Sequence, residues 1–183
     1  MQENRAGRFR ECAMRDGTYL GLLWIVTFAT SILMFKSMDS SYGLIIWPFA
    51  LSLMMLSPVL VYKSAKRYRD KECQGTVPYS EAWLYMLLMY ACAIVLSSIA
   101  QYIFYAYIDP YMFATAAAEI ENLAATGIID TESANILSGM LEEMERMSAG
   151  EIVFSQIGGH VSRDIMITSL LALSIRKTTE NKI

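Results

Sequence analysis

The sequence predicts an all-α integral membrane protein with four transmembrane helices and an extracytoplasmic amphipathic helical hairpin between the third and the fourth. Three observations support this fold class. Of the 183 residues, 55% are apolar and 18% are charged, whereas an average soluble domain carries about 25% charged residues. Residues 83–108 contain no Asp, Glu, Lys or Arg. Lys and Arg gather in short segments beside the apolar runs, as they do in the loops of membrane proteins.

The first two spans are predicted over about residues 18–35 and 42–62. A polar segment with four arginines precedes the first apolar run, which is also the pattern of a cleaved signal peptide. The run is long for a signal, and residues 36–39 form a poor cleavage site. We therefore interpret it as a retained helix and keep cleavage as the alternative. Pro58 is expected to kink or end the second span.

Residues 63–80 are predicted to form a basic cytoplasmic loop, because Gly75 and Pro78 oppose a helix there. Its five cations are Lys63, Lys66, Arg67, Arg69 and Lys71. We interpret this charge as a signal of membrane orientation. The alternative is that the loop binds anionic lipid head groups or a partner.

The third span is predicted over about residues 82–108. Its central run of about 26 residues reaches roughly 39 Å as a helix, enough to cross a hydrocarbon core of about 30 Å. Aromatic residues mark both ends of the run, as membrane interfaces favour. Ser80 is expected to cap the helix, with Glu81 in its first turn.

The helical hairpin is predicted over residues 110–148. Asp109 is expected to cap its first helix, with Pro110 in the first helical position. Gly127 is expected to end that helix, and Asp130 or the next residue to start the second. The second helix is amphipathic, with apolar residues at helical spacing: Ile136, Leu137, Met140, Leu141, Met144 and Met147. We expect this face to pack within the hairpin or on the spans, with docking of a partner or a lipid surface as the alternative.

The fourth span is predicted over about residues 152–175, since its fully apolar part alone, about 11 residues or roughly 16 Å, is too short to cross. This range places polar side chains in the membrane. Together with one side chain of the third span they form a candidate intramembrane cluster: Gln101, Gln156, His160, Arg163 and Asp164. Ionisable groups inside membranes often mark proton or ion paths. We favour a structural role with interhelical hydrogen bonds, because one short polar stripe makes a poor transporter.

The distribution of Lys and Arg predicts the orientation. Four precede the first span, five follow the second and three lie in the C-terminal tail, against one in each of the two opposite segments. Both termini are therefore expected in the cytoplasm of a multi-pass inner-membrane protein, with the hairpin outside. We treat residues 1–183 as a single membrane domain.

Motifs of enzymes and metal sites are missing from the sequence. The chain has one His and three Cys, at spacings that match no metal or redox motif, and HExxH, GxSxG, P-loop and GxGxxG patterns do not occur. We expect no catalytic residues, no cofactor and no metal.

No basic surface with interleaved aromatic residues is visible, so nucleic acid is not an expected partner. The lipid bilayer is an expected partner, and another membrane protein or a second copy of the chain are further candidates.

Residues 66–83, KRYRDKECQGTVPYSEAW, resemble the signature loop of the domain of unknown function 4199 family, a family of bacterial membrane proteins. The sequence Ile-Asp-Pro at 108–110, followed by an acidic hairpin, is also similar to that family. The resemblance implies a four-span inner-membrane protein, and it implies no activity and no functional residues. The segment 158–164 is more polar than the family pattern. The resemblance therefore does not fix where the fourth span begins.

The leading hypothesis is therefore a small, non-catalytic inner-membrane protein that scaffolds or interacts through its outer hairpin. The alternative is a small transporter or channel component that uses the polar stripe of the fourth span. The surroundings of His160, Arg163 and Asp164 distinguish the two, because a cavity favours transport and a closed bundle favours the structural role.

Overall fold

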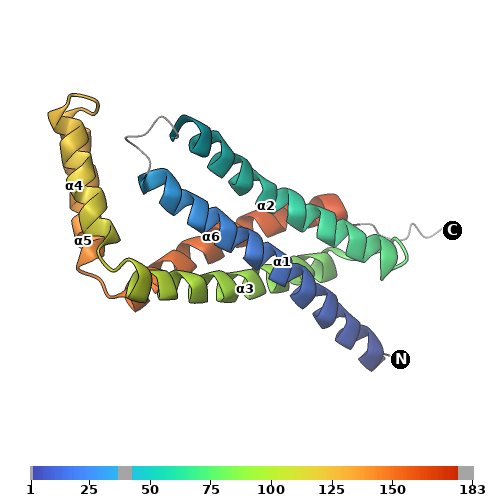
Figure 1. Cartoon of the computed structure of the whole chain (residues 1–183). Coiled ribbons are helices and arrows are strands. Elements are labelled where there is room, and N and C mark those ends of the chain that lie inside the picture. Colours follow the sequence, from blue (N-terminus) through green and yellow to red (C-terminus); the bar gives the residue numbers. More distant parts are fainter. Residues whose placement is uncertain (1, 37–42, 177–183) are drawn as a thin grey trace. The chain divides into compact units, whose positions relative to one another are not determined.

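The computed structural model describes residues 2–36 and 43–176, and within these ranges it contains helices and no β-strand (Figure 1). The predicted all-α fold class is therefore confirmed. The helices are α1 (Gln2–Lys36), α2 (Gly43–Lys71), α3 (Tyr79–Ile103), the π-helical turn η1 (Phe104–Ile108), α4 (Met112–Ala125), α5 (Thr131–Glu145) and α6 (Ala149–Ile175). The candidate cleavage site after Lys36 and the two lysines of the C-terminal tail lie outside the described residues.

Three helices among the described residues are long and apolar enough to cross a membrane. They lie within Ala6–Met34, Pro48–Lys71 and Tyr79–Ile108, which are the places of the first three predicted spans. α6 covers the predicted fourth span but is not one of these three helices, because its polar residues lower its hydropathy.

Helices α1 and α2 extend beyond the apolar runs into the basic segments. α1 begins at Gln2, within the polar N-terminal segment, and α2 continues through Pro58 to Lys71. The prediction of a loop over residues 63–71 is therefore wrong. Pro58 was expected to kink or end the second span; it does not end the helix, and the kink stays a prediction. Lys and Arg are good helix formers, and membrane helices tolerate proline where other groups satisfy the freed backbone carbonyl.

The turn between α2 and α3 is confined to residues 72–78. Gln74 and Gly75 have positive φ values of 53° and 85°, in a backbone region that glycine adopts without strain. α3 then begins at Tyr79, with Glu81 in its first turn as predicted.

The end of the long third helix differs from the prediction at Asp109. α3 continues into η1, and Asp109 ends that turn by donating its backbone N–H to the carbonyl oxygen of Phe104 at 3.0 Å. α4 begins at Met112, with Tyr111 as its N-cap and without a side-chain capping bond. Asp109 therefore belongs to the end of the long helix instead of capping α4. Pro110 lies in the connecting turn, because the π turn carries the long helix as far as the residue before Asp109.

Side-chain caps fix the starts of α5 and α6. Asp130 Oδ1 accepts a hydrogen bond from the Ser133 N–H at 2.8 Å, as expected for a helix start. At α6, Ser148 and Glu151 form a capping box. The Ser148 N–H and hydroxyl both donate to Glu151 Oε2 at 2.8 Å, and Ser148 Oγ accepts from the Glu151 N–H at 3.3 Å. These bonds hold the pKa of the Glu151 carboxyl below its usual value of 4.5.

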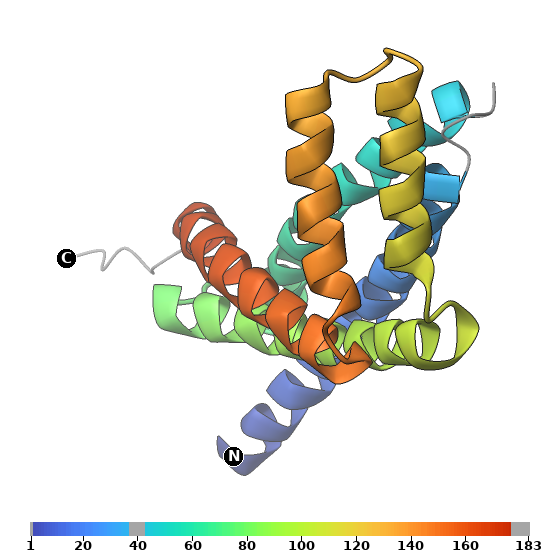
Figure 2. The same cartoon turned by 90° about the vertical axis from the view of Figure 1, so that its left-hand side faces the viewer.

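The chain divides into two compact units. The first comprises Met1–Ser97 and Gly159–Ile183, and the second comprises Ser98–Gly158. In the second unit, α4 and α5 pack side by side (Figure 2). The prediction that the whole chain acts as one domain stays a prediction.

In the core of the first unit, α1 packs closely against α3. Its fully buried side chains include Leu20, Val61, Tyr85, Met86 and Met89. A Cβ atom on Gly17 would lie 2.7 Å from the Met89 carbonyl oxygen, and one on Gly21 would lie 3.0 Å from the Leu96 side chain. Two glycines four residues apart are known to let membrane helices approach closely. Any larger residue at Gly17 would push the two helices apart.

Candidate functional site

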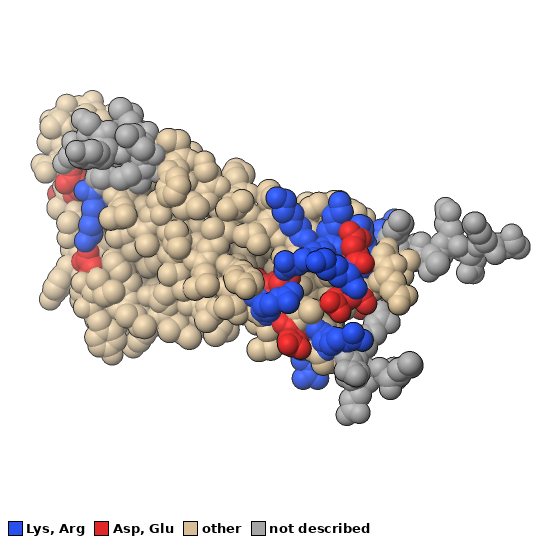
Figure 3. Space-filling view, turned by 45° about the vertical axis from the view of Figure 1, so that its right-hand side comes forward, with Lys and Arg blue, Asp and Glu red and all other residues tan. Residues whose placement is uncertain are grey.

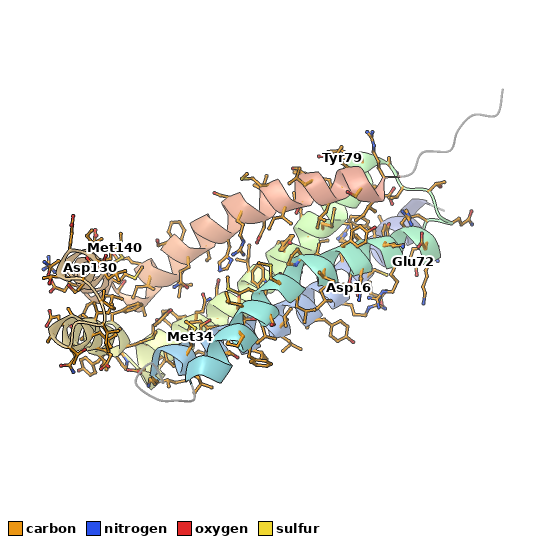
Figure 4. The ribbon with its side chains drawn as sticks, turned by 90° about the horizontal axis from the view of Figure 1, so that it is seen from above. Asp16, Met34, Glu72, Tyr79, Asp130 and Met140 are labelled. Atoms are coloured by element: carbon orange, nitrogen blue, oxygen red, sulfur yellow. The ribbon has the colours of Figure 1, made fainter. Side chains whose placement is uncertain are left out.

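A buried carboxylate on α1, that of Asp16, lies at the centre of a hydrogen-bonded network in the first unit. Its side chain is 1% exposed. Oδ1 accepts from Arg67 Nη2 at 2.7 Å and from Arg15 Nε at 3.2 Å, and Oδ2 accepts from the Tyr85 hydroxyl at 2.8 Å. Three helices thus contribute side chains to this one site. Figure 4 shows Asp16 on α1 toward the same end of the helices as Glu72, just after α2.

Asp16 was not among the predicted site residues. The sequence offers one local signal, an acidic residue at the border between an arginine-rich segment and the first apolar run. The partners that give Asp16 its role, Arg67 and Tyr85, are 51 and 69 residues away. Spacing along one helix carries no information about such distant partners, so the network becomes visible only in the structure.

The five cations of the predicted basic loop lie on the last turns of α2, and they have different surroundings. Arg67 pairs with Asp16. Arg69 is 17% exposed, and it donates to Asp70 Oδ1 at 2.7 Å and to the Ile175 carbonyl oxygen at 3.2 Å. Lys63, Lys66 and Lys71 are exposed, and the Arg67 side chain is exposed in part as well. The two arginines therefore hold helices together, while the lysines give the surface its charge.

The predicted intramembrane cluster is distributed over both compact units. The second unit contains Gln101 and Gln156, and the first contains His160, Arg163 and Asp164. Within the second unit, Gln101 is buried, and Gln156 Nε2 donates to the Tyr105 hydroxyl at 3.3 Å.

His160 and Arg163 pack against Trp24 of α1. The His160 ring stacks on Trp24 with 4.8 Å between ring centroids, and Arg163 Cζ lies 5.7 Å from the Trp24 ring centroid. Arg163 Nη2 lies 2.6 Å from His160 Nδ1. Because a guanidinium group has no acceptor, Nδ1 accepts this bond, and the imidazole is neutral with its proton on Nε2. Trp24, which donates to Ser57 Oγ at 3.0 Å, was not predicted as part of the cluster.

Asp164 is a buried carboxylate of the first unit whose hydrogen bonds are incomplete. Its side chain is 2% exposed, and Oδ1 accepts from Arg163 Nε at 3.1 Å. Asp164 Oδ2 and Thr168 Oγ1, one helical turn further on, are buried and have no hydrogen-bond partner among the described residues. Buried polar atoms nearly always have such partners. In the described part of the chain, no group of three or more His, Cys, Asp or Glu side chains could hold a metal ion.

Three helices that are long and apolar enough to cross a membrane indicate the class of this protein, that of helical membrane proteins. Comparison with protein families is more specific. The family described as "Protein of unknown function (DUF4199)" matches residues 15–177. The chain belongs to this family, and the resemblance seen in the sequence is confirmed. No curated protein and no solved structure matches the chain.

Proposed function

We propose that this protein is a small, non-catalytic inner-membrane protein that scaffolds or binds another membrane protein through the hairpin of α4 and α5. The supporting observation is an exposed apolar stripe on α5. Its members are Ile136, Leu137, Met140 and Met144, followed by Met147 beyond the helix end. The side chains that α5 buries are instead small, Ala134 and Ser138. A contiguous exposed apolar surface of this kind is typical of interaction sites, and methionine adapts to partners of different shape.

A protein partner fits the stripe better than a lipid surface does. Three glutamates of the same helix, Glu142, Glu143 and Glu145, lie among the apolar residues in the sequence and are exposed. Anionic lipids repel such carboxylates. The partner we propose therefore presents an apolar surface and no cluster of acidic groups.

The proposed topology has four spans, with α6 as the fourth and both termini in the cytoplasm. A helix of the length of α6, 27 residues, reaches roughly 40 Å, which is sufficient to cross. The orientation rests on the uneven distribution of Lys and Arg. Reporter fusions after Lys71 and after Ile183 are expected to report the cytoplasm, and a fusion after Gly127 the outside. A cytoplasmic signal after Gly127 would exclude this topology.

Site-specific photocrosslinking tests the interaction surface. A photoreactive side chain at Met140, placed in the full chain in its native membrane, is expected to give a discrete crosslinked species. The same group at Glu142 is the matched control, since it lies on α5 away from the stripe. Co-expression of two differently tagged copies shows whether the species is a second copy of the chain. Equal yields at the two positions, or none at Met140, would contradict an interaction through the stripe.

Transport through the polar cluster of α6 is the second candidate function. The observation that favours it is the unsatisfied pair formed by Asp164 Oδ2 and Thr168 Oγ1, because ionisable groups in membrane helices often line ion paths. The test is proton uptake into proteoliposomes that contain a pH-sensitive dye. Transport predicts that Asp164→Asn and Arg163→Leu abolish uptake while thermal stability in detergent stays near normal. A structural role predicts no uptake by the wild type and an altered stability in Arg163→Leu.

A further inference from the structure

The network around Asp16 borders a cavity of about 310 Å³ in the first unit. Its walls come from α1, from the C-terminal turns of α2 and the residue that follows them, and from Tyr85 of α3. Cavities that bind small molecules usually have volumes from about 300 Å³ upward. The space is therefore large enough for a phosphate group and the atoms next to it.

Cations outnumber anions around this cavity. Arg15, Arg67 and Lys71 carry three positive charges, and Asp16 and Glu72 carry two negative charges. The cavity therefore has a net charge of +1. A phosphodiester carries a single negative charge, so one such group would neutralise it.

Asp16 holds the two arginines at the cavity without covering them. It accepts from one nitrogen of each guanidinium group, Arg67 Nη2 and Arg15 Nε. The two arginine side chains are still 47% and 55% exposed. Guanidinium groups have five N–H donors in a planar fork that matches the oxygens of phosphate. Two guanidinium groups held in place by a shared buried carboxylate are thus preorganised for an anion.

The position of the cavity along the helices matches that of lipid head groups. It lies where the apolar run of α1 begins, beside the exposed Tyr19, and tyrosine favours the membrane interface. Figure 3 shows Lys and Arg gathered at this end of the helices, over the start of α1 and the end of α2, with fewer Asp and Glu among them, while the middle of the same face carries no charge. Such basic surfaces attract anionic lipids.

We propose that this cavity binds the phosphate group of an anionic membrane lipid, held by Arg15, Arg67 and Lys71. The site requires that α1, α2 and α3 cross the bilayer, and it does not depend on the hairpin surface or on the orientation of the chain. It also explains why Asp16 is shared by two arginines: the carboxylate compensates part of their charge and leaves one positive charge for the lipid.

Native mass spectrometry of the full chain tests the proposal. The protein is released from nanodiscs that contain phosphatidylcholine and phosphatidylglycerol in equal parts, and the lipids that stay bound are counted. The wild type is expected to retain phosphatidylglycerol in preference to phosphatidylcholine. Lys71→Gln is the main variant, because Asp16 is bonded by Arg15, Arg67 and Tyr85 and the substitution leaves these bonds intact.

Lys66→Gln is the matched control, since it removes the same charge from the same helix outside the cavity. Attraction by surface charge alone predicts equal losses, about fivefold for each lysine. A site predicts a loss of retained phosphatidylglycerol in Lys71→Gln that is several times larger than the loss in Lys66→Gln. Equal losses, or equal retention of the two lipids by the wild type, would overturn the proposal.

A second measurement separates a lipid from a soluble anion. Thermal unfolding is followed in nanodiscs of phosphatidylcholine alone, with inorganic phosphate added, and in nanodiscs that contain phosphatidylglycerol. The proposal predicts that phosphatidylglycerol raises the unfolding temperature of the wild type and that Lys71→Gln loses this rise. If inorganic phosphate gives the same rise without phosphatidylglycerol, the site binds a soluble anion and the assignment to a lipid is wrong.

Discussion

Asp16 and Asp164 are both almost completely buried and both follow an arginine in the sequence, yet their surroundings differ. Asp16 receives hydrogen bonds from Arg15, from Arg67 of α2 and from Tyr85 of α3. Asp164 receives one from the adjacent Arg163, and its second oxygen has no partner among the described residues. The same dipeptide therefore lies in a complete network at Asp16 and in an incomplete one at Asp164.

The difference shows that burial alone does not tell whether a carboxylate stabilises a fold. A buried charge stabilises the structure only where partners from other elements compensate the loss of water. A buried group with an unused oxygen carries much of the desolvation penalty without that compensation. Removal of the charge is thus expected to have opposite effects at the two positions.

Replacement of Asp16 is expected to have the largest effect. Asp16→Ala leaves two guanidinium groups and the Tyr85 hydroxyl without their shared acceptor. We expect a loss of about 3 kcal/mol, at the lower end for a broken buried ion pair, because the guanidinium groups are half exposed and regain water. The free energy of unfolding in detergent measures this loss. Asp70→Ala is the control, because Asp70 also follows and pairs with an arginine but is 47% exposed, and exposed pairs contribute about 0–1 kcal/mol. Similar losses in the two variants would show that the network around Asp16 contributes no more stability than an exposed ion pair.

Removal of the Tyr85 hydroxyl tests one arm of the same network. Tyr85→Phe keeps the packed ring and removes the donor to Asp16 Oδ2, and hydrogen bonds to charged groups contribute about 1.5–3 kcal/mol. Tyr19→Phe, at a 57% exposed position, is expected to change the unfolding free energy by less than about 0.5 kcal/mol. An unchanged stability of Tyr85→Phe would mean that Oδ2 finds another donor.

Neutralisation of Asp164 is expected to change stability by about 1 kcal/mol or less, and in the stabilising direction. Asp164→Asn removes a buried charge with few partners, and Thr168→Val removes a buried hydroxyl without one. Unfolding in detergent measures both variants. A clear destabilisation by Thr168→Val would indicate a water molecule or an ion between the two side chains, which would support transport.

The smallest effect is expected at the exposed carboxylate of Glu151, which is bonded to the N–H and hydroxyl of Ser148. The lowered pKa of Glu151 means that its capping bonds stabilise the fold fully above the usual pKa of 4.5 and that this contribution is lost as the pH falls through the lowered pKa. Glu151→Gln keeps the capping pattern and removes this pH dependence. The difference in unfolding temperature between wild type and variant is expected to shrink in acid. A constant difference would contradict a role of the Glu151 charge.

The apolar helices could be predicted from the sequence, but their extensions into the basic segments could not. Apolar runs of sufficient length identify α1, α2 and α3, and Asp130 marks the start of α5. The charges of residues 63–71 predict an orientation and say little about secondary structure. What favours a helix there includes the pairing of Arg67 with Asp16, and this contact joins residues 51 positions apart.

The candidate site was predicted only in part for the same reason. The spacing of His160 and Arg163 places them on one side of α6, and the structure joins them by a bond of 2.6 Å. The ring of Trp24, which packs against both, belongs to α1. The spacing of residues along α6 cannot predict this contact. Periodicity within a helix thus identifies neighbours on its surface, and contacts between helices require the fold.

The close contact between Gly17 and Met89 also has a consequence for the order of events during synthesis. The ribosome completes α1 before α3 is synthesised. During this interval Gly17 has no packing partner on α3. Asp16 lacks its Tyr85 donor during the same interval. It lies at the border between the polar and the apolar part of α1, where water can still solvate the carboxylate. A carboxylate in the middle of the apolar run would meet the bilayer unprotected during this interval. We therefore expect Asp16, one residue before Gly17, to stay hydrated until α3 docks and the Tyr85 hydroxyl becomes its donor.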